Sequence, residues 1–336
     1  MGYPAKLMNL SALLAKVEST YGTAVAVTAT ADGQLLALSD RFPGSLQLAY
    51  VFDGEVGAAP GNLGMLKRVG ALGRTITGQI PMRAKGAATT YAATVLPNIH
   101  TMLKISGFDA TLSGGFYTYT PTADSVTYSS ATMEYYKRGE KWTSRGTLAN
   151  WAFSADNPGA PIHTFDVRGI ADTAIADAAM VAPTYPTLTT AEPLATGLTC
   201  SIGSFVAPVV RSCSFTMNRN YDNPRVNLTA ADVHEGFVPN GYDPELRLVI
   251  ESTALTYPTA SGGFDPYKMR LNAEEVAVSV TIGSVSFNKY TVALAQAQLV
   301  EFSPQNDGPV ATIELVFKGF NSSPIIQTDA VVVTFN

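Results

Sequence analysis

The chain has 336 residues and a net charge of −5, with 46% hydrophobic and 15% charged residues. This composition supplies apolar surface for packed cores and excludes a disordered chain. Tight nucleic-acid binding normally needs a basic patch, and the lysines and arginines here are scattered, so that class is disfavoured. An average domain has about 150 residues, so the length predicts two modules.

Residues 5–19 carry the first expected element. Leu10, Leu13, Leu14 and Val17 recur at helical spacing, which predicts a short amphipathic helix; an arm that packs on a neighbour is the alternative. Polar residues interrupt the apolar run at this end and no cleavage site follows it, so we expect no secretory signal. No apolar run approaches the ~18 residues of a membrane helix, so we expect no membrane partner.

The next stretch predicts two strands separated by a long loop. Residues 20–38 are typical of extended chain, and strands are expected at 45–53 and 74–84. The segment between them, 54–73, holds six glycines and a proline. Glycine loses much conformational freedom on ordering, so this loop forms no regular element by itself.

A helix and an antiparallel meander are expected next. Residues 89–107 carry an apolar stripe at helical spacing, and Gly107 is a plausible stop. Segments 115–121, 125–154 and 161–170 alternate apolar with polar residues and are rich in β-branched and aromatic side chains. This pattern predicts consecutive antiparallel strands.

After residue 198 the same order of elements begins again. Residues 171–198 are low in charge and contain several prolines, which is typical of a linker. The following segments predict, in order, a strand, a long loop, a strand, a helical turn and further strands: 209–220, 221–243, 244–255, 262–275, 276–303 and 310–319.

Two similar stretches support an internal repeat. Residues 153–170 and 302–320 both begin Phe-Ser, pass through a polar turn with Asn and Gly, and end in a basic residue and Gly. Asn, Asp and Gly tolerate the positive φ angles of hairpin turns, so each stretch predicts a β-hairpin. An internal duplication of one β-rich module explains both copies. Chance similarity is the alternative, because turns draw on few residue types.

The sequence contains no recognisable catalytic motif. A nucleophile elbow, a phosphate-binding loop, a dinucleotide fingerprint and a helical His-Glu metal motif are all missing. The adjacent Glu274 and Glu275 point to different faces of a helical turn, which disfavours a catalytic pair. We expect no enzyme activity, no metal and no cofactor. Cys200 and Cys213 are expected as reduced thiols, with a hairpin disulfide as the alternative.

Several segments resemble the major tail tube proteins of long-tailed bacteriophages. They are "KVESTYGTAVAVTATADGQLLAL" (16–38), the glycine-rich loop, the helix near 90–106, and "YYKRGEKWTSRGTLANWAFSADNPGAPIHTFDVRGI" (135–170). The resemblance implies a β-sandwich or barrel with a flanking helix, in rings stacked into a tube through which viral DNA leaves. Many members of this family have one tube domain, whereas here the C-terminal half also looks like a tube-type module.

The expected fold is therefore mainly β, with two tandem tail-tube-type β-sandwich or barrel modules, each holding at most one or two short helices. The first module is residues 1–170 with its N-terminal arm, 171–198 is a linker, and the second module is 199–336.

The resemblance also implies residues that contact the adjacent ring. They lie in the glycine-rich loop and in the second long loop: Gly54, Gly57, Gly61, Gly64, Met65, Leu66, Lys67, Arg68 and Gly70, then Asn223, Arg225, His234 and Phe237. A loop too flexible to order alone gains hydrogen bonds on a neighbouring subunit, so its ordering is coupled to assembly.

The expected function is that of a structural virion protein, a tail tube subunit made in the host cytoplasm and located in the virion tail. Its partners are copies of itself and other phage tail proteins, and DNA passes the acidic lumen without specific binding. Two modules per chain predict a trimeric, pseudo-sixfold ring, with a hexamer as the alternative. A two-domain β-sandwich binding protein, such as an adhesin or capsid decoration, is the second hypothesis.

Overall fold

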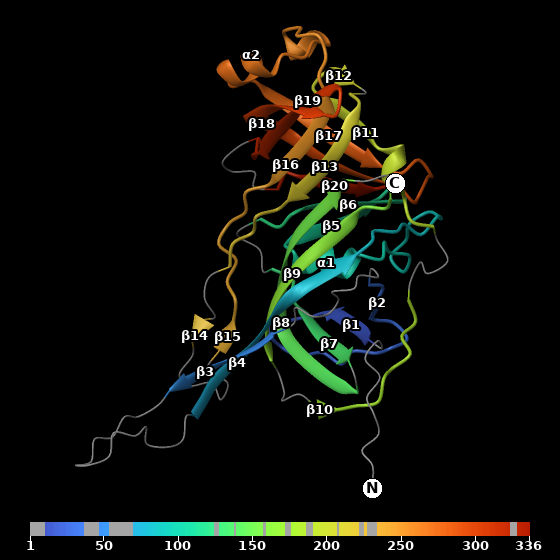
Figure 1. Ribbon diagram of the computed structural model, residues 1–336. Helices are drawn as coiled ribbons and strands as arrows, with labels where there is room; N and C mark the ends of the chain where they lie inside the picture. Colours follow the sequence, from blue (N-terminus) through green and yellow to red (C-terminus); the bar gives the residue numbers. More distant parts are fainter. Residues whose placement is uncertain are drawn as a thin grey trace, which may run out of the picture.

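The computed structural model is mainly β, with 51% of the residues in strands and only short helices (Figure 1). It describes residues 11–36, 47–53, 70–123, 128–137, 139–156, 159–171, 176–185, 191–206, 208–221, 225–226, 234–322 and 328–336. Strand pairing is antiparallel throughout the described pairs.

The N-terminal half contains ten strands and one helix among its described residues. They are β1 (Ser11–Val17), β2 (Gly33–Gln34), β3 (Gln47–Asp53), β4 (Gly70–Met82), α1 (His100–Ile105), β5 (Phe108–Ser113), β6 (Phe116–Pro121), β7 (Ala131–Lys137), β8 (Glu140–Ala155), β9 (Ile162–Ala171) and β10 (Ala176–Asp177).

The C-terminal half has a second set of elements. They are η1 (Ala195–Gly197), β11 (Thr199–Ile202), β12 (Phe205–Val206), β13 (Val210–Thr216), β14 (Arg225–Val226), β15 (His234–Gly236), β16 (Glu245–Glu251), η2 (Thr259–Ser261), α2 (Pro266–Leu271), β17 (Glu275–Ile282), β18 (Tyr290–Asp307), β19 (Val310–Gly319) and β20 (Val332–Phe335).

The strands of each half pair in a definite order. In the N-terminal half the order is β3, β4, β9, β8, β7, β1, β2. In the C-terminal half it is β13, β16, β19, β18, β17, β11, β12. The start of β8 also pairs with β10, and the start of β18 with β20. Both stretches that predict hairpins from sequence form paired strands, β8 with β9 and β18 with β19.

The expected N-terminal helix is wrong where the structure describes it. Residues 11–17 form β1, which pairs with β7 along its whole length. Both faces of this strand are buried: Leu13 belongs to the main core, while Leu14 packs in a second small cluster with Tyr136. A strand covered on both sides has no polar face, so its sequence lacks the alternation that identifies strands.

Two of the other sequence predictions need shorter bounds. The helix expected over 89–107 is confined to α1, because the chain before it carries Pro97 and forms turns. The long segment 276–303 forms β17, a turn and most of β18. The linker assignment of 171–198 stays a prediction; within it, Met180 packs against the small cluster and Glu192 forms an ion pair with Arg83 at 2.5 Å.

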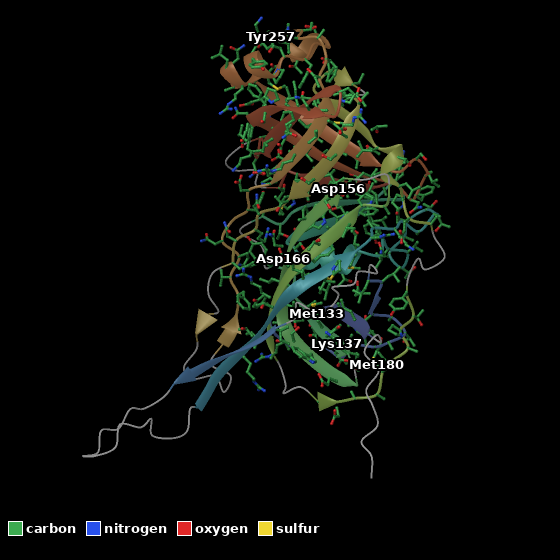
Figure 2. All side chains as sticks on the ribbon, viewed as in Figure 1. Met133, Lys137, Asp156, Asp166, Met180 and Tyr257 are labelled. Atoms are coloured by element: carbon green, nitrogen blue, oxygen red, sulfur yellow. The ribbon has the colours of Figure 1, made fainter. Side chains whose placement is uncertain are left out.

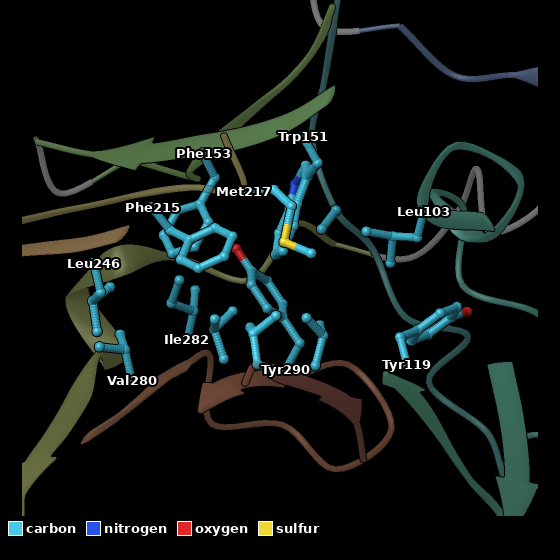
Figure 3. Close-up of a cluster of buried hydrophobic side chains, with 14 of the residues drawn as sticks. Leu103, Tyr119, Trp151, Phe153, Phe215, Met217, Leu246, Val280, Ile282 and Tyr290 are labelled. Carbon is cyan, nitrogen blue, oxygen red and sulfur yellow. The ribbon is translucent and has the colours of Figure 1, made fainter. Parts of the chain in front are cut away.

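One hydrophobic core runs through both halves. Trp151 and Phe153 on β8 face Phe215 on β13, with ring centroids 4.9 Å apart for Trp151 and Phe215 (Figure 3). Tyr290 on β18 lies in the same cluster. The halves are also joined by backbone, because β13 pairs with the end of β8 and β20 pairs with β6.

His163 lies at the centre of this shared core and is fully buried. Trp151 Nε1 donates to His163 Nδ1 at 3.1 Å, and His163 Nε2 lies 2.8 Å from the Tyr290 hydroxyl. Indole N–H is a donor only, so Nδ1 accepts and Nε2 carries the proton that it donates to Tyr290. Burial lowers the pKa of His163 from 6.5 to about 3, which keeps this imidazole neutral.

Candidate assembly and lumen surfaces

A single antiparallel run of strands crosses from one half to the other. Its order is β3, β4, β9, β8, β13, β16, β19, β18, and the crossing point is the pairing of Ala152–Ala155 on β8 with residues of β13. Where its side chains are described, from Arg74 of β4 onward, one face of this run packs on the core and the other carries mostly polar residues. On β16, Leu246, Leu248 and Ile250 are buried while the alternate residues face outward.

The outward face of the C-terminal strands carries several ion pairs. Arg247 lies between Glu245 at 2.7 Å and Glu314 at 3.4 Å. Arg211 pairs with Glu251 at 2.5 Å, and further pairs on this face join Arg211 to Asp307 and Lys318 to Asp243. Five carboxylates thus face three cations. Exposed pairs contribute little stability, so the main effect of this set is an acidic sheet face.

The polar face is hollowed where the two halves meet. A depression of about 250 Å³ is lined by Ala152, Ser154, Thr164, Ser214 and Thr216, with Glu245 and Arg247 at its C-terminal side; Phe153 and Phe215, whose rings pack in the core, also border it. The lining residues at the surface are small and uncharged across the junction. The polar face therefore continues from β9 to β16 with no bulky side chain between the halves.

The described part of the second long loop around β15 lies against the N-terminal half. Arg225 on β14 pairs with Gly236, and His234 on β15 pairs with Val226. Phe237 follows β15 and is 5% exposed. The Tyr21 hydroxyl accepts from the Phe237 amide at 2.8 Å and donates to the Phe237 carbonyl at 2.7 Å.

Tyr21 therefore holds the backbone of Phe237, at the end of this loop, through two hydrogen bonds; we call this contact the Tyr21 clamp. Burial raises the pKa of Tyr21 to about 12, so the hydroxyl stays protonated and able to donate. Gly236, next to Phe237, has a φ of +140°, and a Cβ there would lie 2.5 Å from the Tyr21 ring. Only glycine fits at that position.

We expect the Tyr21→Phe variant to lose about 1–2 kcal/mol of unfolding free energy, because both bonds to Phe237 disappear in a half-buried site. Amide exchange at Phe237 should accelerate more than exchange in β16. Tyr267→Phe is the matched control, since Tyr267 is 50% exposed. Equal exchange at Phe237 in the variant and the wild type would contradict the clamp.

Most of the predicted contact residues lie outside the described part of the chain: Gly54, Gly57, Gly61, Gly64, Met65, Leu66, Lys67, Arg68 and Asn223. Gly70 begins β4 and pairs with Asp53 of β3. Arg225, His234 and Phe237 are brought together at the β14 and β15 hairpin. The role of all these residues in ring contact stays a prediction.

Sequence reasoning missed the residues that hold the halves together. Arg219 is 5% exposed; its Nη2 donates to the Gly107 carbonyl at 3.4 Å, and its guanidinium lies 4.9 Å from the Tyr128 ring centroid. The Arg219 amide donates to Asn150 Oδ1 at 3.0 Å. No short motif marks these residues, because their partners are far apart in sequence.

The buried acid Glu18 is saturated with hydrogen bonds. Its carboxylate accepts from the Ser130 and Thr132 hydroxyls at 2.5 and 2.9 Å, and from the Gly22 and Gly146 amides at 2.8 and 2.9 Å. A carboxylate with these four donors is fixed in place. We therefore assign Glu18 to the packing of the turn at residues 18–22 against β7 and β8.

Among the described residues, no cluster of three or more His, Cys, Asp or Glu side chains has the geometry to hold a metal ion. Within the same residues, no helix is long and apolar enough to cross a membrane. Cys200 and Cys213 are both buried and unpaired, and burial raises the pKa of the Cys200 thiol to about 12. Figure 2 shows the side chains on the ribbon.

Neither a protein-family model nor a curated protein sequence matches this chain significantly.

Proposed function

We propose that this protein is a structural subunit of a bacteriophage tail tube, built from two tandem modules. Three chains form a pseudo-sixfold ring, rings stack around a lumen, and DNA leaves through it. The subunit acts by assembly with copies of itself and with other tail proteins in the virion, and it catalyses no reaction.

The observation that carries the proposal is the match in strand order between the halves. The N-terminal order β3, β4, β9, β8, β7, β1, β2 matches, strand for strand, the C-terminal order β13, β16, β19, β18, β17, β11, β12. The helices also correspond, since α1 follows β4 and α2 follows β16. Chance similarity of two hairpins does not account for a whole pairing order.

Irregularities of the sheet support the same correspondence. Between β7 and β8 the register shifts between Ala131 and Met133, and between β17 and β18 it shifts between Val276 and Val278. In both cases one residue of the shorter strand faces two of the longer strand. Bulges of this kind are inherited with a fold, so two equivalent bulges favour duplication.

The helix ends match as well. Gly107 lies two residues after α1 with a φ of +82°, and Ala273 lies two residues after α2 with a φ of +49°. A left-handed residue at this point ends a helix. The hairpin of β5 and β6 has no counterpart after α2, so the modules differ there.

The polar sheet face supports the lumen assignment. It runs through both halves, it is acidic in the C-terminal half, and small residues line its centre. A wall that repels phosphates does not retain passing DNA. When each chain joins the next in the way that its own two modules join, the polar face continues from chain to chain around a closed ring.

Native mass spectrometry of a single ring tests the stoichiometry, and electron microscopy of the purified protein tests the tube. We expect rings of three chains that stack into tubes. Six chains per ring, with residues 199–336 outside the lumen wall, would refute the two-module ring. A monomer that binds a glycan or a capsid surface would favour the adhesin or decoration hypothesis.

A further inference from the structure

We infer that the outer edge of β18, beside α2, is the docking site for β3 of a second copy of this chain. The inference rests on the tandem repeat proposed above and names the surface through which one chain joins the next. It follows from comparing two equivalent edges, one of which is occupied inside the chain.

The occupied edge belongs to β8. One side of β8 pairs with β10 and β9, and the other pairs first with β7 and then, at Ala152–Ala155, with β13. β13 is the first strand of the long antiparallel run in the C-terminal half. The halves therefore join by placing that first strand on the tip of β8.

Among the described residues, no strand pairs with the equivalent edge of β18. One side of β18 pairs with β20 and β19, and the other pairs with β17 only as far as Gln298. From Leu299 to Asp307 this second side has no strand partner among the described residues. The counterpart of β13 is β3, and within the described residues β3 pairs with β4 alone.

Backbone groups on this edge point outward in a regular pattern. Asp307 and Val310 flank a two-residue turn and form the closing pair of the hairpin. In an antiparallel ladder the alternate residues then direct their N and O atoms away from the partner, so Phe302, Pro304 and Asn306 face the open side. An unpaired edge of this kind is a template for strand addition.

Pro304 shortens this ladder relative to the one between β8 and β13, because it offers no N–H. Two donors and three acceptors remain on the edge. The docking strand therefore needs side-chain contacts in addition to its backbone bonds.

Those contacts are available on α2. Tyr267 is 50% exposed and Leu271 is 83% exposed, and residues four apart lie on one face of a helix. The Tyr267 ring packs edge-on against Phe302 of β18, with centroids 4.6 Å apart. The apolar patch is thus continuous with the open edge.

Helix α1 has the equivalent position at the occupied edge. Gly107, two residues after α1, accepts from Arg219, which follows β13. A chain that docks β3 on β18 would contact the exposed end of α2 in the same way. This gives a head-to-tail contact, which closes into a ring and leaves no free edge.

Sedimentation velocity over a concentration series tests this site with two variants. Leu271→Asp places a charge in the patch, and Asn306→Pro removes one outward donor without touching the β19 ladder. Each should raise the concentration for half-assembly roughly tenfold or more, as expected for a central interface residue. Val285→Asp is the matched control, because Val285 is 59% exposed and lies on a different loop.

Hydrogen exchange on the wild type gives a second readout that needs no variant. The amides of Phe302 and Asn306 should be protected in the assembly and unprotected in dilute monomer, whereas Ser303 and Gln305, which face β19, should be protected in both. Assembly with Phe302 and Asn306 still unprotected, or with both variants unaffected, overturns this site and leaves the tube function standing. Closed rings that use this edge but never stack support the site and overturn the tube. A chain that stays monomeric overturns both.

Discussion

Replacing Trp151 by alanine is expected to lower the free energy of unfolding by about 3–5 kcal/mol, the usual cost of removing a large buried aromatic side chain. Trp151 is 0% exposed, and its ring packs against Phe108, Phe153, Phe215 and His163. The variant also leaves the His163 Nδ1 acceptor without its donor, which adds to the cost.

The same variant tests whether the two halves unfold together. Because Trp151 packs on Phe215 of the other half, its loss should destabilise both in one transition, seen as coincident urea curves by far-UV circular dichroism and Trp142 fluorescence. Phe116→Ala is the control: Phe116 is 40% exposed, so its loss should cost about 1 kcal/mol or less. A loss below 1 kcal/mol in Trp151→Ala would show that this contact does not organise the core.

Acid is expected to destabilise the fold well above the pH at which carboxylates titrate. Burial lowers the pKa of His163 to about 3 and that of His100 to about 4, against 6.5 in an unfolded chain. Between those values the unfolded state binds protons that the folded state rejects, so stability falls as the pH drops below 6.5. At pH 5 each histidine costs about 2 kcal/mol relative to pH 7, since one pKa unit corresponds to about 1.4 kcal/mol.

Urea unfolding from pH 7 to pH 4.5 measures this effect. His163→Gln should be less stable at pH 7, because it loses hydrogen bonds to Trp151 and Tyr290. The slope of its unfolding free energy against pH should be smaller than in the wild type, by the equivalent of about one bound proton. Phe116→Ala should keep the wild-type slope. An unchanged slope in His163→Gln would show that His163 titrates normally in the folded chain.

The sequence by itself determined the class of fold and the order of most strands. Alternation along residues 161–170 and 310–319 identified β9 and β19, because core residues such as Phe165 and Leu315 alternate with polar ones such as Asp166 and Glu314. The helical turn predicted over 262–275 contains α2, and in the structure Asp265 caps it, because its side chain accepts from the Tyr267 and Lys268 amides. Local chemistry of this kind needs no distant partner.

Only the tertiary structure decided which surfaces meet. The spacing of Leu10, Leu13, Leu14 and Val17 fits a helix. Residues 11–17 nevertheless form a strand, because they pair with β7 and residues 178–181 cover their outer face. Tyr21 binds Phe237 across 216 residues, and Arg219 meets Gly107 across 112. Contacts between such distant positions depend on how sheets stack, and no local pattern of side chains encodes them. The open edge of β18 is invisible in sequence for the same reason: its residues are those of any strand, and only the pairing among the described residues shows which side lacks a partner strand.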